Sequence, residues 1–407
     1  MPDIRTITPD DAEHFRSRVS RGFGDDADMG SEARERFDAI FEYDRTIAAF
    51  DDGDIVGTTA AFSLGVTVPG GSTVPMGGTT VVTVQPTHRR RGLLRSMMTA
   101  HLEDVASREE PLAGLWASEA SIYGRFGYGP ATFRHVVEVD ARSVQFRDPP
   151  GDGRLRLVEP EAADPLEREV YEQTRPERVG MLTRSDAWWS YRLIADPEAW
   201  RGGKSAQRHL VHEEGGAITG YSRYRQKGKW EDFVAKGEVE VIEVIALTDT
   251  AHQAMWGFLT SIDLYPNVEA WNLAVDDPLP YEVTDGRRVS RKIVDALWLR
   301  VMDVPAALEA RGYEEPGSLV MEVVDPAEPS TSGVYRLTSS EGIGTCESVD
   351  DTPDVTLDAD ALGSLYLGGG GAMSLAAAGR IRGDVGAVTR LHRMMRIARP
   401  PWCPDVF

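Results

Sequence analysis

An arginine-rich turn is the stretch of this sequence whose residue types most clearly predict chemistry. Arg89, Arg90, Arg91 and Arg95 fall within seven residues and surround Gly92, although the chain carries a formal net charge of −21. Guanidinium groups gathered beside a glycine that precedes a helix indicate a site for an anion such as a diphosphate. The alternative is an ordinary connection whose arginines are solvated. The spacing matches neither G-x-G-x-x-G nor the P-loop pattern, which disfavours a Rossmann dinucleotide site and a P-loop.

The elements on either side of this turn have to position it. Residues 79–84 are all β-branched, as in a strand, and Pro86 prevents further pairing. A mostly apolar set of side chains then recurs at spacings of three and four residues, which predicts one face of a helix. Its members are Leu94, Met97, Met98, His101, Leu102 and Val105. We also expect the strand to splay from its neighbour, which would leave a backbone N–H near Val82 to Val84 free to bind a carbonyl oxygen.

Other side chains are candidates for chemistry with equally plausible structural roles. Tyr123 could donate a proton, because a phenol has a pKa of about 10, but Tyr123 and Tyr128 could both be packing residues. Asp25, Asp26 and Asp28 could hold ammonium groups, or could form a solvated acidic loop.

Several remaining polar and aromatic residues predict structure rather than chemistry. His88 lies beside the arginine turn, and we expect it to cap that turn. We expect three tryptophans to lie in the core: Trp188, Trp189 and Trp200. Cys346 and Cys403 are far apart and lack metal-ligand spacing, so they predict neither a disulfide framework nor a zinc site.

Composition limits the partners of this chain. With 44 Lys and Arg against 65 Asp and Glu in 407 residues, nucleic acid and an anionic membrane surface are disfavoured partners. The charge fits a cationic substrate, or solubility alone. The N-terminus lacks an apolar signal segment and no long apolar run occurs, so we expect a soluble cytoplasmic protein.

The order of predicted elements divides the chain into regions. We expect the first region to contain, in order, helices over 8–43, a hairpin over 46–68, the strand, turn and helix described above, a buried strand over 112–117 and a closing strand over 133–140. A glycine- and proline-rich linker over 146–154 follows.

Two more regions follow the linker. The second repeats the order of strands and a helix, but its junction at 248–253 contains neither glycine nor arginine. We therefore expect this region to lack the anion site and to be structural or to shape a substrate pocket. The third begins with a strand near 296–301 and ends in an apolar, proline-rich tail.

Several segments resemble the Eis-type (enhanced intracellular survival) N-acetyltransferases of the GNAT superfamily, and the resemblance covers the whole chain. The most specific are residues 86–95 (PTHRRRGLLR), 117–119 (ASE), 122–132 (IYGRFGYGPAT), 304–313 (VPAALEARGY) and 362–368 (LGSLYLG). Leu94, where a generic GNAT loop has a small residue, is usual in this family.

The resemblance implies an α/β (α+β) fold with three domains. These are a GNAT domain over 1–145 that binds acetyl-CoA, a second GNAT-like domain over 151–293 without a cofactor site, and a sterol-carrier-protein-like domain over 294–407 whose C-terminus enters the active site. It also implies a homo-hexamer that uses no metal and transfers acetyl to primary amines of small polycationic, aminoglycoside-like substrates. Alternatives are acetylation of protein or peptide lysines, and a non-catalytic lipid-carrier role of the last domain.

Site residues also follow from the resemblance. Cofactor contacts fall on the following residues: Val82, Thr83, Val84, Arg90, Arg91, Gly92, Leu93, Leu94, Arg95, Ser118 and Glu119. Tyr123 becomes the general acid that protonates the departing thiolate, Tyr128 stays structural, and the terminal carboxylate of Phe407 becomes the general base. An α-carboxylate with a pKa of about 3.3–3.7 is a poor base unless its surroundings raise that pKa. Val406 stands where family members can carry a carboxylate, which alters the expected charge of the amine pocket.

Overall fold

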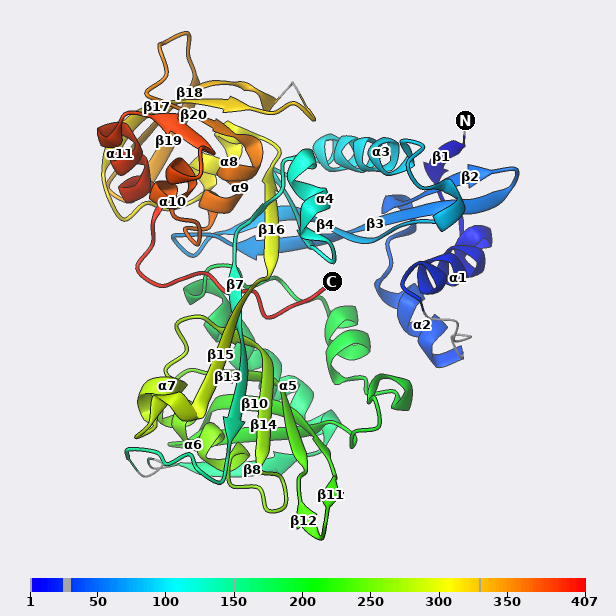
Figure 1. Ribbon diagram of the computed structural model, residues 1–407, viewed down its shortest axis with the longest axis vertical. Coiled ribbons are helices and arrows are strands. Elements are labelled where there is room, and N and C mark those ends of the chain that lie inside the picture. The colour runs from blue at the N-terminus through cyan, green and yellow to red at the C-terminus, as the bar shows by residue number, and fades with distance from the viewer. Residues whose placement is uncertain (1, 25–30, 149–150, 152, 329–330) are drawn as a thin grey trace. The chain divides into compact units, whose positions relative to one another are not determined.

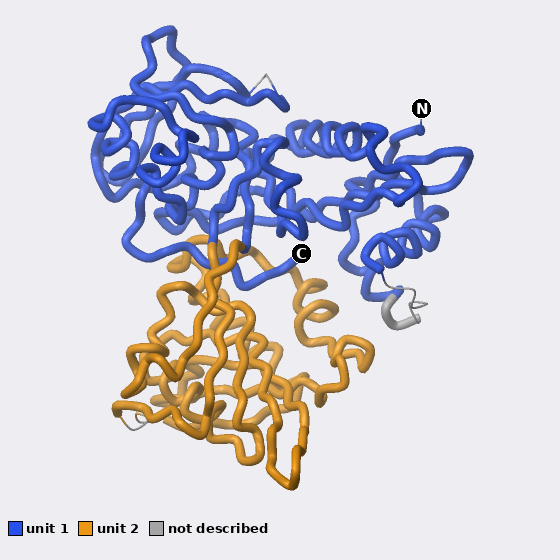
Figure 2. The backbone as a smooth tube through the Cα atoms, in the orientation of Figure 1, with its two compact units in different colours: residues 1–132, 296–407 blue, residues 133–295 orange. Residues whose placement is uncertain are grey.

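The chain passes through two parts of the fold, leaving the first after Thr132 and returning to it at Ala296 (Figures 1 and 2). The structure is a computed structural model that describes residues 2–24, 31–148, 151, 153–328 and 331–407. Unit 1 comprises residues 1–132 and 296–407, and unit 2 comprises residues 133–295.

A seven-stranded sheet forms the first half of unit 1. Its strands, in spatial order, are β1 (Asp3–Thr6), β2 (Thr46–Asp51), β3 (Asp54–Thr67), β4 (Thr73–Val84), β5 (Leu112–Trp116), β16 (Leu297–Val301) and β6 (Gly129–Pro130). The helices of this half are α1 (Ala12–Gly22), α2 (Ser31–Ile40), α3 (Leu93–Ser107) and α4 (Ala120–Tyr123). The predicted hairpin, strand–turn–helix and buried strand are confirmed.

The helix after the arginine turn buries the predicted face with one shift. Met97, Met98, His101, Leu102 and Val105 are buried on α3 as expected. The first apolar position is Leu93 rather than Leu94, which is only half-buried. Because the helix begins at Leu93, its apolar stripe starts at its first residue.

The prediction for one strand is wrong, because this strand belongs to the other seven-stranded sheet. Residues 133–140 were expected to close the first sheet, but β7 (Phe133–Asp140) pairs with β14 (Asn267–Ala274) and β15 (Val289–Asp295) in unit 2. The position beside β5 is taken by β16, which we expected to open the third region. The sequence pattern of a buried strand is the same in either sheet, so alternation of side chains could not distinguish the two.

A second sheet of five strands completes unit 1. Its strands, in spatial order, are β19 (Ile343–Ser348), β18 (Gly333–Ser340), β17 (Gly317–Val324), β20 (Val355–Asp358) and β21 (Ile381–Gly383). Its helices are α8 (Val304–Ala310), α9 (Ala359–Tyr366), α10 (Ala372–Ala377) and α11 (Val385–Met395). Helix α9 packs closely on β16, since a Cβ on Gly363 would lie 2.1 Å from the Leu299 carbonyl oxygen.

Unit 2 is built on a sheet with the same arrangement. Its strands, in spatial order, are β8 (Arg154–Val158), β9 (Arg208–Glu214), β10 (Ala217–Lys227), β13 (Glu238–Ala246), β14 (Asn267–Ala274), β7 and β15 (Val289–Asp295). Its helices are α5 (Pro160–Thr174), α6 (Asp249–Leu259) and α7 (Leu279–Glu282), with a π-helix at Trp188–Ile194. A two-stranded hairpin, β11 (Trp230–Glu231) with β12 (Val234–Ala235), stands apart from the sheet. The strands and helix predicted for the second region are confirmed.

The tryptophan prediction is confirmed for two residues and wrong for the third. Trp188 and Trp189 are buried, whereas Trp200 is 44% exposed. In the part of the chain that the structure describes, no helix is long and apolar enough to cross a membrane.

Candidate active site

A cavity opens where two central strands of unit 1 separate. Strands β4 and β5 pair in parallel from Met76 and Leu112 to Gly78 and Gly114, and β4 then continues without a partner in β5. The predicted splay is therefore present. The cavity beyond it has a volume of about 280 Å³ and is lined by Phe23, Thr79, Thr80, Val81, Val82, Leu115, Trp116, Ala117, Ser118, Tyr123, Val406 and Phe407.

A β-bulge shapes the β4 side of this cavity. Thr83 pairs with Thr58 and Thr80 with Ala60, so Val81 and Val82 together oppose a single residue of β3. Val81 has a φ of 47°, a left-handed conformation that is strained for a β-branched residue. The Thr58 hydroxyl donates to the Val81 carbonyl at 2.7 Å and holds the bulge. A bulge next to a splay turns backbone groups of β4 toward the cavity.

The two tyrosines of the predicted motif have different environments. Tyr123 is buried, and among the described residues its hydroxyl has no hydrogen-bond partner. The Tyr128 hydroxyl lies 3.0 Å from the Thr79 hydroxyl, which lies 2.7 Å from Nε2 of His101. Only Tyr123 therefore has a hydroxyl free to reach a bound molecule, while Tyr128 packs against it edge-on.

Burial keeps the proton on Tyr123. Desolvation, and then the nearby Glu119 carboxylate, raise the pKa of Tyr123 to about 12. The phenol is therefore neutral throughout the physiological range and can donate its proton to a stronger base. Glu119 itself is exposed, and Ser118 lines the cavity beside it.

The C-terminal tail reaches the same cavity. Trp402 and Cys403 are buried in unit 1, and Phe407 lines the cavity together with Tyr123. The Phe407 ring packs on the last paired residue of β4, because a Cβ on Gly78 would lie 3.1 Å from its Cε2 atom. Among the described lining residues, the terminal carboxylate of Phe407 is the one anionic group.

The arginine turn leaves the start of α3 open. Gly92 occupies the N-cap position with a φ of 85°, and no side chain caps the helix. The first N–H groups of α3 therefore face outward, where a helix N-terminus binds anions. Arg90, Arg91 and Arg95 have no ion pair with any other described residue. Arg90 also adopts a left-handed φ of 62°, which shows how tightly the turn is wound.

Two other residues predicted to contact the cofactor use their side chains within the fold. The Thr83 hydroxyl bonds to Thr58 within the sheet at 2.7 Å, and the Leu93 side chain lies in the core. His88 does not cap the turn as expected; its Nε2 atom pairs with Asp51 at 3.0 Å. Arg89 donates to the Val84 carbonyl at 3.2 Å and so closes the turn on the end of β4.

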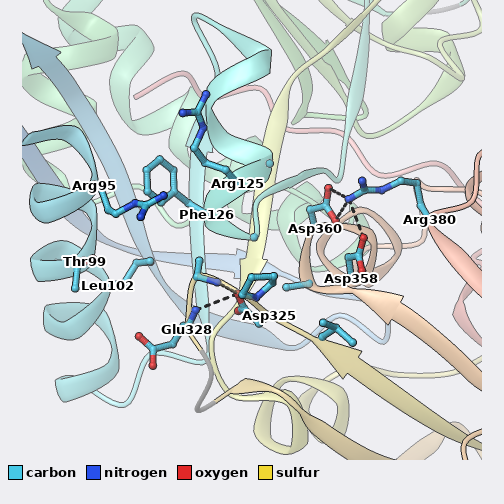
Figure 3. A pocket seen from close by; sticks show the side chains of 16 residues that line it. Arg95, Thr99, Leu102, Arg125, Phe126, Asp325, Glu328, Asp358, Asp360 and Arg380 are labelled. Carbon is cyan, nitrogen blue, oxygen red and sulfur yellow. Dashed lines mark hydrogen bonds and ion pairs between the residues drawn. The ribbon is translucent and has the colours of Figure 1, made fainter. Parts of the chain in front are cut away.

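Arg95 also borders a second, larger cavity of about 470 Å³ in unit 1 (Figure 3). Most of its charges are paired internally. Arg380 binds Asp360, and Asp325 forms a buried pair with Arg300 at 2.6 Å. This cavity lies between α3 and the loops of the five-stranded part, and it does not contain Tyr123 or Phe407.

Sequence reasoning missed Phe23, Thr58, Thr79 and His101 as parts of this site. Phe23 is 59% exposed at the cavity, although it follows α1 in a region read only as helical. His101 was read as one of several apolar helix positions, and burial lowers its pKa to about 4. A histidine on an otherwise apolar face was the available signal. Asp25, Asp26 and Asp28 lie outside the described residues, within which no group of acidic, histidine or cysteine side chains could hold a metal ion.

Comparison with known proteins gives this geometry a family context. Residues 3–131 and 180–301 each match an acetyltransferase (GNAT) domain model, and residues 304–404 match a sterol carrier protein domain model. These matches confirm the predicted fold class. The chain is 41% identical to an uncharacterized N-acetyltransferase of Streptomyces avermitilis, over 100% of this chain and 99% of that protein.

Two mycobacterial proteins are also similar. The N-acetyltransferase Eis of Mycobacterium tuberculosis is 40% identical, over 81% of this chain and 80% of that protein. The crystal structure of Eis1 from Mycobacterium abscessus superposes with a TM-score of 0.86 at 32% identity and covers 100% of both chains.

Proposed function

The chain belongs to the Eis-type N-acetyltransferase family of the GNAT superfamily, and from this premise we propose that it transfers acetyl from acetyl-CoA to a primary amine of a small polycationic, aminoglycoside-like substrate. Membership makes the chain an acyltransferase with an amine acceptor. One observation carries the finer proposal: the Tyr123 hydroxyl and the chain terminus line one cavity at the β4–β5 splay.

The residues of the arginine turn suit the coenzyme. The open N–H groups after Gly92, with Arg90, Arg91 and Arg95, would hold its diphosphate. Backbone groups of Val82 to Val84 would orient the chain that leads to the thioester, beside Ser118 and Glu119 across the splay. Acetyl-CoA supplies the acetyl group as a thioester when it is bound.

The side chains then handle two protons. The amine nitrogen bonds to the acetyl carbon while the carbon–sulfur bond breaks, and no enzyme nucleophile is needed. Tyr123 protonates the sulfur, since its pKa of about 12 keeps the phenol protonated until a thiolate forms beside it. The Phe407 carboxylate accepts the proton that the amine loses. Its negative charge, in a cavity lined by neutral side chains, also attracts a cationic amine.

The proposal also includes the domain limits, the cellular location and the oligomeric state. Along the sequence we place the domain limits at 1–145, 151–293 and 294–407, with acetyl-CoA binding in the first domain, although β7 pairs in the sheet of unit 2 and β16 in the first sheet of unit 1. We further propose that the enzyme works in the cytoplasm as a homo-hexamer.

Removal of the last residue tests the proposal. A thiol-release assay with acetyl-CoA and a panel of polycationic amines should show turnover for the full chain. Deletion of Phe407 should lower kcat by about 100-fold or more, because it moves the terminal carboxylate one residue back, while acetyl-CoA still binds. Undiminished turnover after the deletion would remove the carboxylate from the mechanism. If a lysine peptide outcompetes every small amine, the substrate class is peptide or protein lysines and not small polycationic amines.

The two tyrosines provide a matched pair for the acid. Tyr123→Phe should lower kcat by roughly 100-fold with little change in acetyl-CoA affinity. Tyr128→Phe removes a hydroxyl of similar burial from the adjacent ring, and kcat should stay within a few-fold of the parent value. Equal losses in both variants would contradict the assignment of Tyr123. Full activity in both, with lipid bound to the purified protein, would favour a carrier role.

A further inference from the structure

An arm projects from unit 2 between two strands of its sheet. Residues 227–237, which we call the arm, contain β11 and β12, and these pair only with each other (Figure 1). The two residues at its tip, Asp232 and Phe233, have φ values of 46° and 64°. Asp tolerates this left-handed conformation, whereas a bulky aromatic residue rarely adopts it. A tip of Asn-Gly type would be easier to form, so turn formation does not account for an aromatic residue at this position.

The arm exposes large apolar side chains. Phe233 is 100% exposed, Trp230 is 63% exposed and Val234 is 46% exposed. None of them contributes to a core cluster of unit 2. A two-stranded hairpin gains little stability by itself, and adjacent exposed aromatic residues on a protruding element are typical of an interaction site.

The arm is also where the lysines of this chain gather. Of five lysines in 407 residues, three lie in the arm: Lys227, Lys229 and Lys236. Lys229 pairs with Glu231 at 2.8 Å, while Lys227 and Lys236 form no ion pair with any other described residue. On a chain with a net charge of −21, these cations favour contact with an acidic protein surface.

Such a surface lies on the same sheet. Glu138 of β7, Glu269 of β14 and Glu240 of β13 are directly opposite one another on three adjacent strands. Like charges in this position destabilise a sheet. Lys204 pairs with Glu240 at 2.8 Å and also attracts Glu269 at longer range, but Glu138 and Glu269 form no ion pair with any described residue. We call these three residues the glutamate row.

The base of the arm is fixed beside this row. Arg142, just after β7, donates to the Ala235 carbonyl at 2.5 Å, and the Asn267 amide at the start of β14 reaches the Lys236 carbonyl at 3.4 Å. Arm and row therefore lie next to each other on one unit. Two copies related by a two-fold axis could exchange arms, so that each arm meets the row of the other copy and the contact closes on itself.

We propose that the arm docks on the glutamate row of a second copy of this chain, with Phe233 and Trp230 as apolar anchors and the arm lysines against Glu138 and Glu269. The contact is independent of the acetyl transfer chemistry. The arm contact does rest on the homo-oligomer proposed above, because the arm and the glutamate row are the surfaces that would form this oligomer.

Light scattering during size-exclusion chromatography of the full chain tests the contact. The parent protein should be oligomeric at low salt. Phe233→Ser should raise the dissociation constant of the arm contact at least 100-fold, and the double reversal Lys227→Glu with Lys236→Glu at least tenfold. Ile343→Ser removes a side chain of similar exposure from β19 in unit 1 and should leave the mass unchanged. Circular dichroism checks that each variant is folded.

A charge exchange makes the test specific to the row. Glu138→Lys with Glu269→Lys should weaken the oligomer, and combining these with the two lysine reversals should restore it. An oligomer that survives every arm variant would overturn this contact and leave the homo-oligomer standing. A monomeric parent protein would overturn both. Binding of the arm to phosphatidylserine vesicles, with the mass unaffected, would replace the second copy by a membrane surface.

Discussion

The two seven-stranded sheets have the same arrangement but differ where the fourth strand in spatial order leads into a helix. In unit 1 this junction joins β4 to α3, and in unit 2 it joins β13 to α6. Both strands continue beyond their parallel pairing: β4 pairs with β5 only to Gly78, and β13 pairs with β14 only to Val241. The splay alone therefore does not distinguish a site that binds a coenzyme.

The cap position does distinguish them. At the start of α3, Gly92 offers no side chain, so the first N–H groups are available to an anion. At the start of α6, the Thr248 hydroxyl accepts the N–H of Ala251 at 3.1 Å and occupies that position itself. With a capping side chain and no arginines, α6 has an ordinary helix start, without the open N–H groups that we propose hold the diphosphate at α3.

Helices α3 and α6 each bury one histidine, and the two histidines differ in charge state. Burial lowers the pKa of His101 on α3 to about 4, and the ring serves as a neutral partner of Thr79. His252 on α6 is nearly as buried, but Asp277 and Glu282 contact its two nitrogens at 3.2 and 2.9 Å and raise its pKa to about 10. In unit 2 the helix that is capped by its own threonine therefore carries an internal cation held by two carboxylates.

Placing a charge in the open cap should have the largest effect. Gly92→Asp brings a carboxylate to the N-terminus of α3, at a φ of 85° that Asp tolerates better than most residues. It would place a negative charge beside the open N–H groups of α3 and repel a diphosphate. Acetyl-CoA affinity measured by calorimetry should fall at least 100-fold, about 3 kcal/mol.

The neutral variant Gly92→Asn is the control for this change. It places a side chain of the same size at this position without adding charge and should cost less affinity, roughly tenfold. Unchanged binding in the Asp variant would mean that the diphosphate does not lie at this turn, and the comparison between the two junctions would then lose its functional meaning.

The sequence was sufficient to predict the difference between the junctions, because glycine and arginine at 89–95 and their absence at 248–253 act locally. It was not sufficient to predict which sheet takes β7 and β16. β7 follows the first region in sequence but pairs with β14 of the second sheet, and β16 follows the second region but pairs with β5 of the first sheet. The alternation of side chains along a strand carries no information about such non-local pairing. Short strands such as β6 and the free hydroxyl of Tyr123 likewise depend on tertiary contacts.

The two histidines should give opposite pH dependences of stability. The folded-state pKa of His252 is above the ordinary value of 6.5, so its stabilising effect is full below pH 6.5 and is lost as the pH rises toward 10. Urea denaturation should show that the parent protein loses roughly 2 kcal/mol relative to His252→Gln between pH 6.5 and 8.5. The folded-state pKa of His101 is below 6.5, so its contribution is lost as the pH falls toward 4.

His101→Gln therefore serves as the counterpart of that measurement. It should remove pH dependence on the acidic side, between pH 6.5 and 4, and leave the alkaline side as it is in the parent protein. If His252→Gln still loses stability as the pH rises from 6.5 to 8.5, the buried cation of unit 2 is not the group responsible. The two helices would then differ only in how their first turns are capped.

Removing the cap from the second junction should have the smallest effect and isolates what the cap alone contributes. Thr248→Ala deletes the hydroxyl that accepts the Ala251 N–H, which should lower the free energy of unfolding of unit 2 by about 1 kcal/mol. Acetyl-CoA affinity should not change, because an open helix start without neighbouring arginines lacks the charge that holds a diphosphate. Calorimetry and urea denaturation of the same sample measure both quantities. A second molecule of acetyl-CoA bound by Thr248→Ala would show that the cap, and not the arginines, decides which junction binds the coenzyme.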